Sequence, residues 1–217
     1  MEINESKYSV SELIQYLFTN PKEAFRDIIL WDRKEIVHIS FFLVSVEKAF
    51  ERAELNHYGD SQSLDNIILS AIIIGGISGY LFMYLYSFGI DFTGQRIGGK
   101  SKKKEIRNIV AWASIPSIFL LIIFLLRIIT FGENVFRSES MLESNELSEY
   151  LGYFFALIQV LLSFITLRIL VIGIATAQQF SFNKAILNII LAVLLILIPV
   201  ILLFMGFYLL TGNERTP

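Results

Sequence analysis

The sequence predicts an all-α membrane protein, a polytopic bundle of five transmembrane helices behind a short amphipathic region. Of the 217 residues, 54% are hydrophobic, whereas a soluble domain usually holds about 45–50% apolar residues. The apolar residues are grouped into blocks of helix length, and about 20 helical residues cross a hydrocarbon core of about 30 Å. Lysine and arginine gather in the segments that would share one side of the membrane, as the positive-inside rule requires.

Residues 1–35 are predicted to form a cytoplasmic amphipathic segment of two short helices. Ser9 and Glu12 have the spacing of a capping box, in which two side chains satisfy the first amide groups of a helix. Asn20 and Pro21 match the cap and the first helical position of a second helix. The apolar faces fit either a segment lying on the membrane surface or a helix pair packed on the cytoplasmic ends of the spans.

Five spans are predicted to follow, and residues 211–217 are left as a short external tail. The last four are each long enough to cross with some tilt. The first is the weakest, because it would be only about 22 Å long at 1.5 Å per residue and would need local thinning or snorkelling side chains to cross. The spans cover about 36–50, 67–90, 106–131, 151–175 and 185–210.

The distribution of basic residues supports the short first span. With five spans and a cytoplasmic amino terminus, the cytoplasmic segments hold twelve lysines and arginines, the outer segments hold five, and Arg168 lies inside a span. With four spans, the basic amino-terminal region and the basic loop after the second span would lie on opposite sides, and this bias would vanish. The loop over 132–150 is then external, and its glutamates lack the spacing of a calcium loop, so we expect them to be solvated.

The loop between the second and third spans contains a nucleotide-binding pattern in an unsuitable setting. Gly94 to Ser101 spells G-Q-R-I-G-G-K-S, a match to G-x-x-x-x-G-K-[ST]. A phosphate-binding loop must follow a buried strand and open a helix, because that turn directs backbone N–H groups at the phosphates. Here the pattern follows a membrane span. We therefore expect a basic turn between two spans, and no nucleotide binding by Gly94 to Ser101.

The same loop supplies the predicted contact surface of the cytoplasmic face. Basic side chains beside a membrane attract anionic headgroups, at about 1 kcal/mol for each residue. The predicted partners are the lipid bilayer and a membrane protein or a second copy of the chain. The residues expected to contact the membrane surface or a partner are Lys100, Lys102, Lys103, Lys104 and Arg107.

Small residues and prolines inside the spans predict how the helices pack. Ala71, Gly75 and Gly79 recur every four residues on one face of the second span, which lets another helix approach closely. The simpler interpretation of this face is packing against another helix of the same chain. The alternative is contact with a second copy of the chain in a homodimer. Pro116 and Pro199 lie inside spans and are expected to kink them.

The fourth span carries a polar face. Gln159, Ser163 and Thr166 follow helical spacing, and such a stripe can line a pathway for an ion or a substrate. The alternative is a seam of hydrogen bonds between helices, with Asn188 of the fifth span as one partner and Arg168 reaching the headgroups. We favour the seam, because a coupled transporter usually has buried acidic residues in mid-span and none appears in mid-span here.

Several kinds of chemistry have no support in the sequence. The chain has no cysteine and two histidines, and neither histidine stands in a metal-binding or protease motif. There is no nucleophile-elbow motif, and a net charge of −2 does not favour nucleic acid as a partner. We therefore expect a non-enzymatic protein without a cofactor or a metal.

Three segments resemble the Yip family of Ypt/Rab-GTPase-interacting membrane proteins and its bacterial relatives. They are Asn20-Pro21 to Phe25, the stretch G-G-K-S-K-K-K-E-I-R-N-I-V-A-W-A-S-I-P (98–116), and G-I-A-T-A-Q-Q-F-S-F-N-K-A-I-L (173–187). The resemblance implies a five-span domain with a cytoplasmic amino terminus. Ala111 and Trp112 replace the Gly-Tyr of the eukaryotic Gly-Tyr-x-x-x-Pro element, and the first 35 residues hold no Tyr-Gly-Pro element. The chain is therefore similar to bacterial members, which implies a location in the bacterial cytoplasmic membrane.

Two functions are compatible with these features. The first is an interaction or organising module that acts through its basic cytoplasmic face, which follows from the predicted topology and from the lack of catalytic motifs. The alternative is a small transporter or channel for a small molecule, an ion or a lipid, which would use the polar face of the fourth span.

Overall fold

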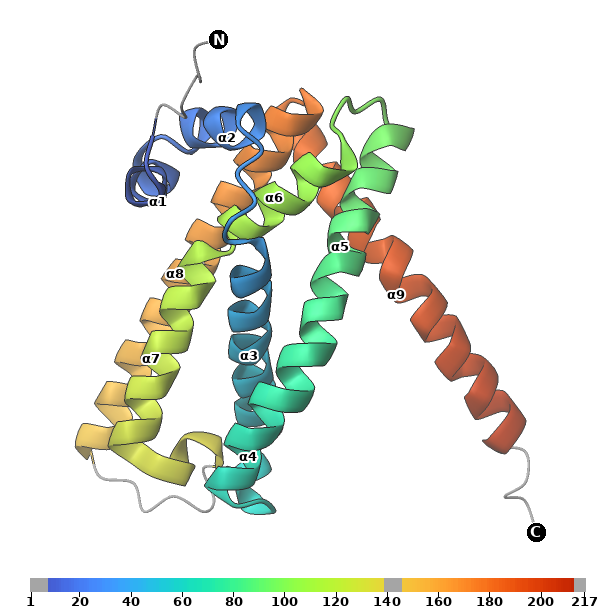
Figure 1. Cartoon of the computed structure of the whole chain (residues 1–217). Helices are drawn as coiled ribbons and strands as arrows, with labels where there is room; N and C mark the ends of the chain where they lie inside the picture. Colours follow the sequence, from blue (N-terminus) through green and yellow to red (C-terminus); the bar gives the residue numbers. More distant parts are fainter. Residues whose placement is uncertain (1–7, 139–145, 213–217) are drawn as a thin grey trace.

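The computed structural model describes residues 8–138 and 146–212, which form helices joined by short turns (Figure 1). Residues 1–7, positions 139–145 of the predicted external loop and the tail from 213 lie outside the described residues. The elements are α1 (Val10–Thr19), α2 (Pro21–Leu30), α3 (Val37–Leu55), η1 (Tyr58–Asp60), α4 (Leu64–Ser70), the π-helical turn η2 (Ala71–Gly75), α5 (Gly76–Arg96), α6 (Lys103–Ala113), α7 (Ile115–Phe131), η3 (Gly132–Phe136), α8 (Glu146–Gln178) and α9 (Phe182–Gly212).

Four helical stretches are long and apolar enough to cross a membrane, and they correspond to the last four predicted spans. They cover Leu64–Arg96, Lys103–Phe136, Tyr150–Gln178 and Phe182–Gly206. The prediction of an all-α, polytopic membrane bundle is therefore confirmed.

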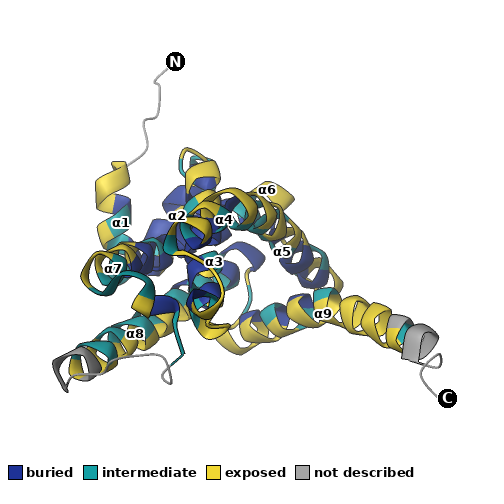
Figure 2. Ribbon diagram, turned by 90° about the horizontal axis from the view of Figure 1, so that it is seen from below, coloured by how far each residue is buried: buried dark blue, intermediate teal, exposed yellow. Residues whose placement is uncertain are grey.

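The first predicted span corresponds to α3, which is not one of these four. With 19 residues, α3 is about 28 Å long, which is longer than the predicted 36–50. Its second half holds Glu47, Lys48 and Glu51, so hydropathy does not select it. It packs against α5 and α7 and lies in the middle of the bundle (Figures 1 and 2). Its length and position fit a crossing helix, and the count of five spans stays a prediction.

Residues 106–131, predicted to be one helix, form two. Helix α6 ends at Ala113, and Ser114 caps it with a hydroxyl that donates to the Val110 carbonyl at 2.7 Å. Pro116 is the second residue of α7, a position where proline costs nothing because the first amide groups of a helix have no partner within the helix. As a result α6 runs obliquely across the end of the bundle and α7 runs along it (Figure 1).

The amino-terminal helices pack on the end of the bundle beside α6, the second of the two alternatives for this region. The capping box of Ser9 and Glu12 is present at the start of α1. Leu13 and Phe25 of this helix pair are fully buried in one cluster with Trp112 of α6. The Trp112 indole N–H also donates to the carbonyl of Arg33 at 2.8 Å, so the segment between α2 and α3 is fixed to α6.

The outer surface of the bundle is apolar along its length. Large apolar side chains of α5, α8 and α9 are exposed, and the carboxyl-terminal part of α9 diverges from the other helices (Figures 1 and 2). An exposed apolar surface of this extent is typical of a protein that faces lipid rather than water. The polar contacts inside the bundle are therefore the features most able to carry function.

Candidate functional site

The glycine loop between α5 and α6 encloses the side chain of Gln178, the last residue of α8. A Cβ added to Gly94 or Gly99 would lie less than 3 Å from the carboxamide of Gln178, a separation that real Cβ atoms do not show. Gln178 is fully buried. Both positions must therefore be glycine for the loop to close around this side chain, and the turn also uses a positive φ of 86° at Gly98.

The backbone donors of the loop are directed at Gln178. The amide of Lys100 donates to the Gln178 carbonyl at 3.4 Å, and that of Ser101 donates to its Oε1, also at 3.4 Å. The Nε2 of Gln178 has no hydrogen-bond partner among the described residues. A phosphate-binding loop would aim these N–H groups at phosphates and would follow a strand, whereas this loop follows α5 and holds a side chain of the protein itself.

A second set of polar contacts ties α5 to α9 beside the loop. Thr93 Oγ1 donates to Oδ1 of the fully buried Asn188 at 2.7 Å. Asp91 accepts from Gln95 Nε2 at 3.0 Å and from the Ser101 hydroxyl at 3.5 Å. Asn188 had been expected to join the polar face of the fourth span, and the structure instead places its amide against α5.

The three segments that carry the family resemblance meet at this end of the bundle. A Cβ added to Gly173 of α8 would lie less than 3 Å from Ile109 of α6 and from the ring of Phe25 of α2. Gln178, from the same segment as Gly173, lies in the loop formed by residues 94–101. The resemblance therefore reflects a set of close contacts that hold α2, α6 and α8 together.

The predicted basic contact residues surround the start of α6, and part of their charge is already paired. Lys104 Nζ lies 3.0 Å from Asp32 Oδ2, and Lys103 Nζ lies 4.8 Å from the centroid of the Phe88 ring. The Arg107 guanidinium stands 5.7 Å from the Tyr84 ring centroid, and its Nε is buried without a hydrogen bond. Lys100, Lys102, Lys103 and Lys104 are all exposed.

The ion pair with Lys104 also changes the acidity of Asp32. The hydrogen bond from Lys104 holds the pKa of the Asp32 carboxyl below its ordinary value of 3.8, and the Asn108 amide, which donates at 3.0 Å, adds to the effect. Asp32 therefore stays ionised at any pH near neutrality, and it fixes the turn after α2 to α6.

The small residues of the second span are used within the chain. A Cβ on Gly75 would lie less than 3 Å from Ala49, and one on Gly79 less than 3 Å from Ser45, both residues of α3. Ala71 is buried in the same contact between α3 and η2. These small residues therefore let α3 approach η2 and α5 closely within one chain, which is the intramolecular interpretation of this face.

The two predicted kink prolines differ in their positions. Pro116 stands at the start of α7, after the break at Ser114, whereas Pro199 lies inside α9. Helix α9, which contains Pro199, diverges from the bundle toward its carboxyl-terminal end (Figure 1).

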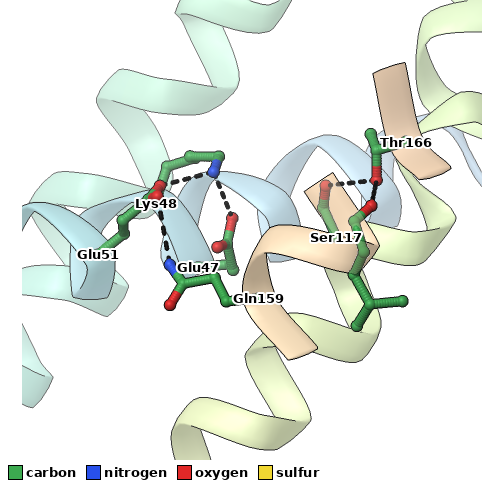
Figure 3. Close-up of polar contacts among 7 residues, drawn as sticks. Glu47, Lys48, Glu51, Ser117, Gln159 and Thr166 are labelled. Atoms are coloured by element: carbon green, nitrogen blue, oxygen red, sulfur yellow. Dashed lines mark hydrogen bonds and ion pairs between the residues drawn. The ribbon is translucent and has the colours of Figure 1, made fainter. Parts of the chain in front are cut away.

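The polar face of the fourth span divides between two neighbours (Figure 3). Gln159 Nε2 donates to Glu51 Oε1 of α3 at 3.3 Å. Thr166 Oγ1 lies 3.5 Å from the Ser117 hydroxyl of α7 and also donates to the carbonyl of Leu162. Ser163 is exposed on the outer side of α8. Two of the three residues therefore form the predicted interhelical hydrogen bonds, with α3 and α7 as partners.

The structure places one acidic residue near the middle of α3, the helix that corresponds to the first predicted span. Glu47 stands near the middle of α3 and its side chain has no exposed surface. Lys48 Nζ lies 2.6 Å from Glu51 Oε2 and 3.4 Å from Glu47 Oε2, and Arg127 of α7 holds Glu54 with contacts of 2.5 and 3.0 Å. The sequence signal was available, because the charged residues continue the helical register of the first predicted span without a helix-breaking residue.

The described residues offer little for catalysis or metal binding. Within them, no three His, Asp or Glu side chains converge closely enough to hold a metal ion. His38 Nδ1 and the Tyr80 hydroxyl form a hydrogen bond of 2.7 Å between α3 and α5. What the arrangement can do is bind at its basic surface and hold charge between its helices.

Comparison with known families gives one result. A family model described as the Yip1 domain matches residues 15–204. Comparison with curated proteins and with solved structures finds no match. The matched range begins within α1 and ends within α9, so it includes the loop, the Gln178 contact and the polar cluster of α3.

Proposed function

Because the chain belongs to the Yip1 domain family, we propose that it is a non-enzymatic, multi-pass membrane protein that acts as an interaction module at the cytoplasmic face of the membrane. In this proposal α3 is the first of five crossings, the amino terminus is cytoplasmic, and the membrane is the cytoplasmic membrane of a bacterium. Its partners are anionic headgroups and a membrane protein that presents acidic residues at the same surface.

The observation that carries the proposal is the exposed basic surface around the start of α6. Lys100, Lys102 and Lys103 are exposed there, at the end of the bundle where α1 and α2 pack. The contacts with Gln178 hold the loop that carries these lysines. Its backbone is therefore ordered before a partner binds, which reduces the entropy lost on binding. Each lysine contributes about 1 kcal/mol near an anionic surface.

The experiment compares loss of charge at the two ends of the bundle. The full chain in nanodiscs that contain phosphatidylglycerol is cross-linked to its lipids and to co-purified membrane proteins. Replacing Lys100, Lys102, Lys103 and Lys104 by glutamine should reduce both kinds of product, and Arg52→Gln, an exposed charge at the other end of α3, should not. Equal association of the lysine variant and the unchanged chain would exclude this surface.

A second function has one observation in its favour. The buried Glu47, with Lys48, Glu51 and Gln159 beside it, is the kind of intramembrane charge cluster that marks ion and substrate pathways. A transporter or channel built on it would show solute or lipid flux in reconstituted vesicles. That flux should be abolished by Gln159→Leu and unaffected by the four lysine substitutions.

A further inference from the structure

The carboxylate of Glu47 is the most unusual polar group of the described bundle. Its side chain has no exposed surface, and neither oxygen has a hydrogen-bond partner among the described residues. The nearest cation is the Lys48 ammonium, with Nζ 3.4 Å from Oε2. An ionised carboxylate in an apolar interior is costly unless it is paired and hydrogen-bonded, and an intramembrane acidic residue is a candidate functional site.

A chain of polar atoms leads from this carboxylate to the outside of the helix packing (Figure 3). Lys48 Nζ bridges Glu47 and Glu51, at 3.4 Å from the first and 2.6 Å from the second. Gln159 of α8 then donates to the other oxygen of Glu51. The Glu47 side chain is 0% exposed, whereas the next two side chains of this chain, Lys48 and Glu51, are 48% and 28% exposed. The buried oxygen is therefore connected to accessible groups by contacts shorter than 4 Å.

The surroundings limit what this site can bind. On its own helix Glu47 faces Lys48 and Glu51. From α7 the nearest charge is Arg127, which is occupied by Glu54, and from α8 the polar group is Gln159. The contact of α3 with η2 and α5 is made of small residues, with Ala49 against Gly75 and Ser45 against Gly79. No metal-holding cluster is present among the described residues, so the ligand that fits a sealed carboxylate is a proton.

We propose that Glu47 is a proton-exchange site inside the membrane, with Lys48, Glu51 and Gln159 as the route to it. In uptake, the Lys48 ammonium transfers a proton to a Glu47 oxygen, and the neutral amine is reprotonated from water at Glu51. Release reverses these two transfers. The three side chains change from a net charge of −1 to zero when Glu47 is protonated, so uptake removes the uncompensated charge from the interior. This site rests on the proposal that α3 crosses the membrane, and it does not depend on the basic surface.

The test is pH-difference infrared spectroscopy of the full chain in nanodiscs, in which a protonated carboxyl has its own C=O stretching band. Every carboxyl of the chain gives such a band as the pH falls, so the Glu47 band is taken from the difference between the unchanged chain and a variant, and it should shift when water is replaced by D₂O. The band should be lost in Glu47→Gln, which keeps the size of the side chain, and kept in Asp65→Asn, which removes an exposed carboxylate of α4. In Glu51→Gln the D₂O shift should develop more slowly, since the exposed proton acceptor is gone.

Each remaining outcome would overturn the proposal. If the same bands appear in Glu47→Gln and in the unchanged chain, Glu47 does not take up a proton. If the Glu47 band is present at every pH and never shifts in D₂O, the residue is a sealed structural acid. Helical circular dichroism and a single elution peak for each variant establish that the comparison is made between folded proteins.

Discussion

The cytoplasmic end of the bundle and the middle of α3 both bury polar side chains, but they do so in different ways. At the loop, the neutral carboxamide of Gln178 accepts an N–H from Ser101 and fits between two glycines. In α3, the charged carboxylate of Glu47 receives no hydrogen bond from the described residues and has only one cation close to it. The Gln178 carboxamide completes the packing of the loop, whereas the Glu47 carboxylate places a charge in the interior at a cost in stability.

The cost helps to distinguish the two uses. An unsatisfied buried polar group destabilises a fold by about 1–3 kcal/mol, and more when it is charged. A substitution at the loop should therefore act through steric fit, whereas a substitution near Glu47 should act through charge.

Gly99→Ala should give the largest loss of stability. The added Cβ would lie less than 3 Å from Gln178 and also from the backbone oxygen of Gly94, and backbone cannot move aside as a flexible side chain can. We expect a loss of about 3 kcal/mol, the upper part of the range for overpacking, measured by thermal unfolding in detergent. Gly152→Ala is the control, because a Cβ at that helical position meets nothing within 4 Å.

A double substitution sharpens the same point. Gln178→Ala removes the carboxamide with which the added Cβ of Gly99→Ala clashes. The loss of stability in the double variant should therefore be smaller than the sum of the losses in the two single variants. Fully additive losses would show that the loop and the glutamine do not act as one unit.

Arg127→Met should give a smaller loss, through charge. Arg127 holds Glu54 with two contacts between α7 and α3, and its removal leaves Glu54 unpaired. Because the Glu54 side chain is 29% exposed, we expect a loss of about 2 kcal/mol, below the 3–5 kcal/mol of fully buried pairs. Adding Glu54→Gln should recover part of the stability. A double variant less stable than Arg127→Met would contradict this account.

These two regions also differ in how far they could be predicted from sequence. The long spans could be predicted, because apolar runs of helix length need no knowledge of distant residues. The loop could be recognised as a turn, but its partner Gln178 could not, since the contact joins residues 77 positions apart. Glu47 was missed for a different reason: it lies near the end of the predicted span 36–50, and only the full length of α3, Val37–Leu55, places it near the middle of the helix.

The break between α6 and α7 was only partly predictable. Pro116 indicated a kink, and a proline near the start of a helix is equally common. The choice between them depends on tertiary packing, because α6 is amphipathic and buries Ile106 and Ile109 against the amino-terminal helices. Composition alone could not show that residues 106–113 run in a different direction from the rest of the predicted span.

Thr93→Val should give a loss of about 1 kcal/mol at the loop end of the bundle. The change keeps the shape of the side chain and removes the hydrogen bond to Asn188, a contact of ordinary strength whose loss leaves Oδ1 of a buried amide unsatisfied. The control is Thr130→Val, because the Thr130 hydroxyl is exposed and bonds only within α7. Equal unfolding temperatures for the two variants would show that the contact between α5 and α9 adds nothing.

The smallest effect concerns Asp32, the carboxylate that contrasts most directly with Glu47. The hydrogen bond from Lys104, and then that from Asn108, hold the Asp32 pKa below its ordinary value of 3.8. Because the folded-state pKa is lowered, the pair stabilises the fold at any pH above 3.8, and this contribution is lost as the pH falls through the lowered pKa. The pair is exposed and open to screening by salt, so little global stability should change. A carboxyl-carbon NMR titration should find the Asp32 midpoint below 3.8 in the unchanged chain and higher in Lys104→Gln. An unmoved midpoint would mean that Lys104 does not hold the turn to α6, and that this lysine is available to the partners of the basic surface.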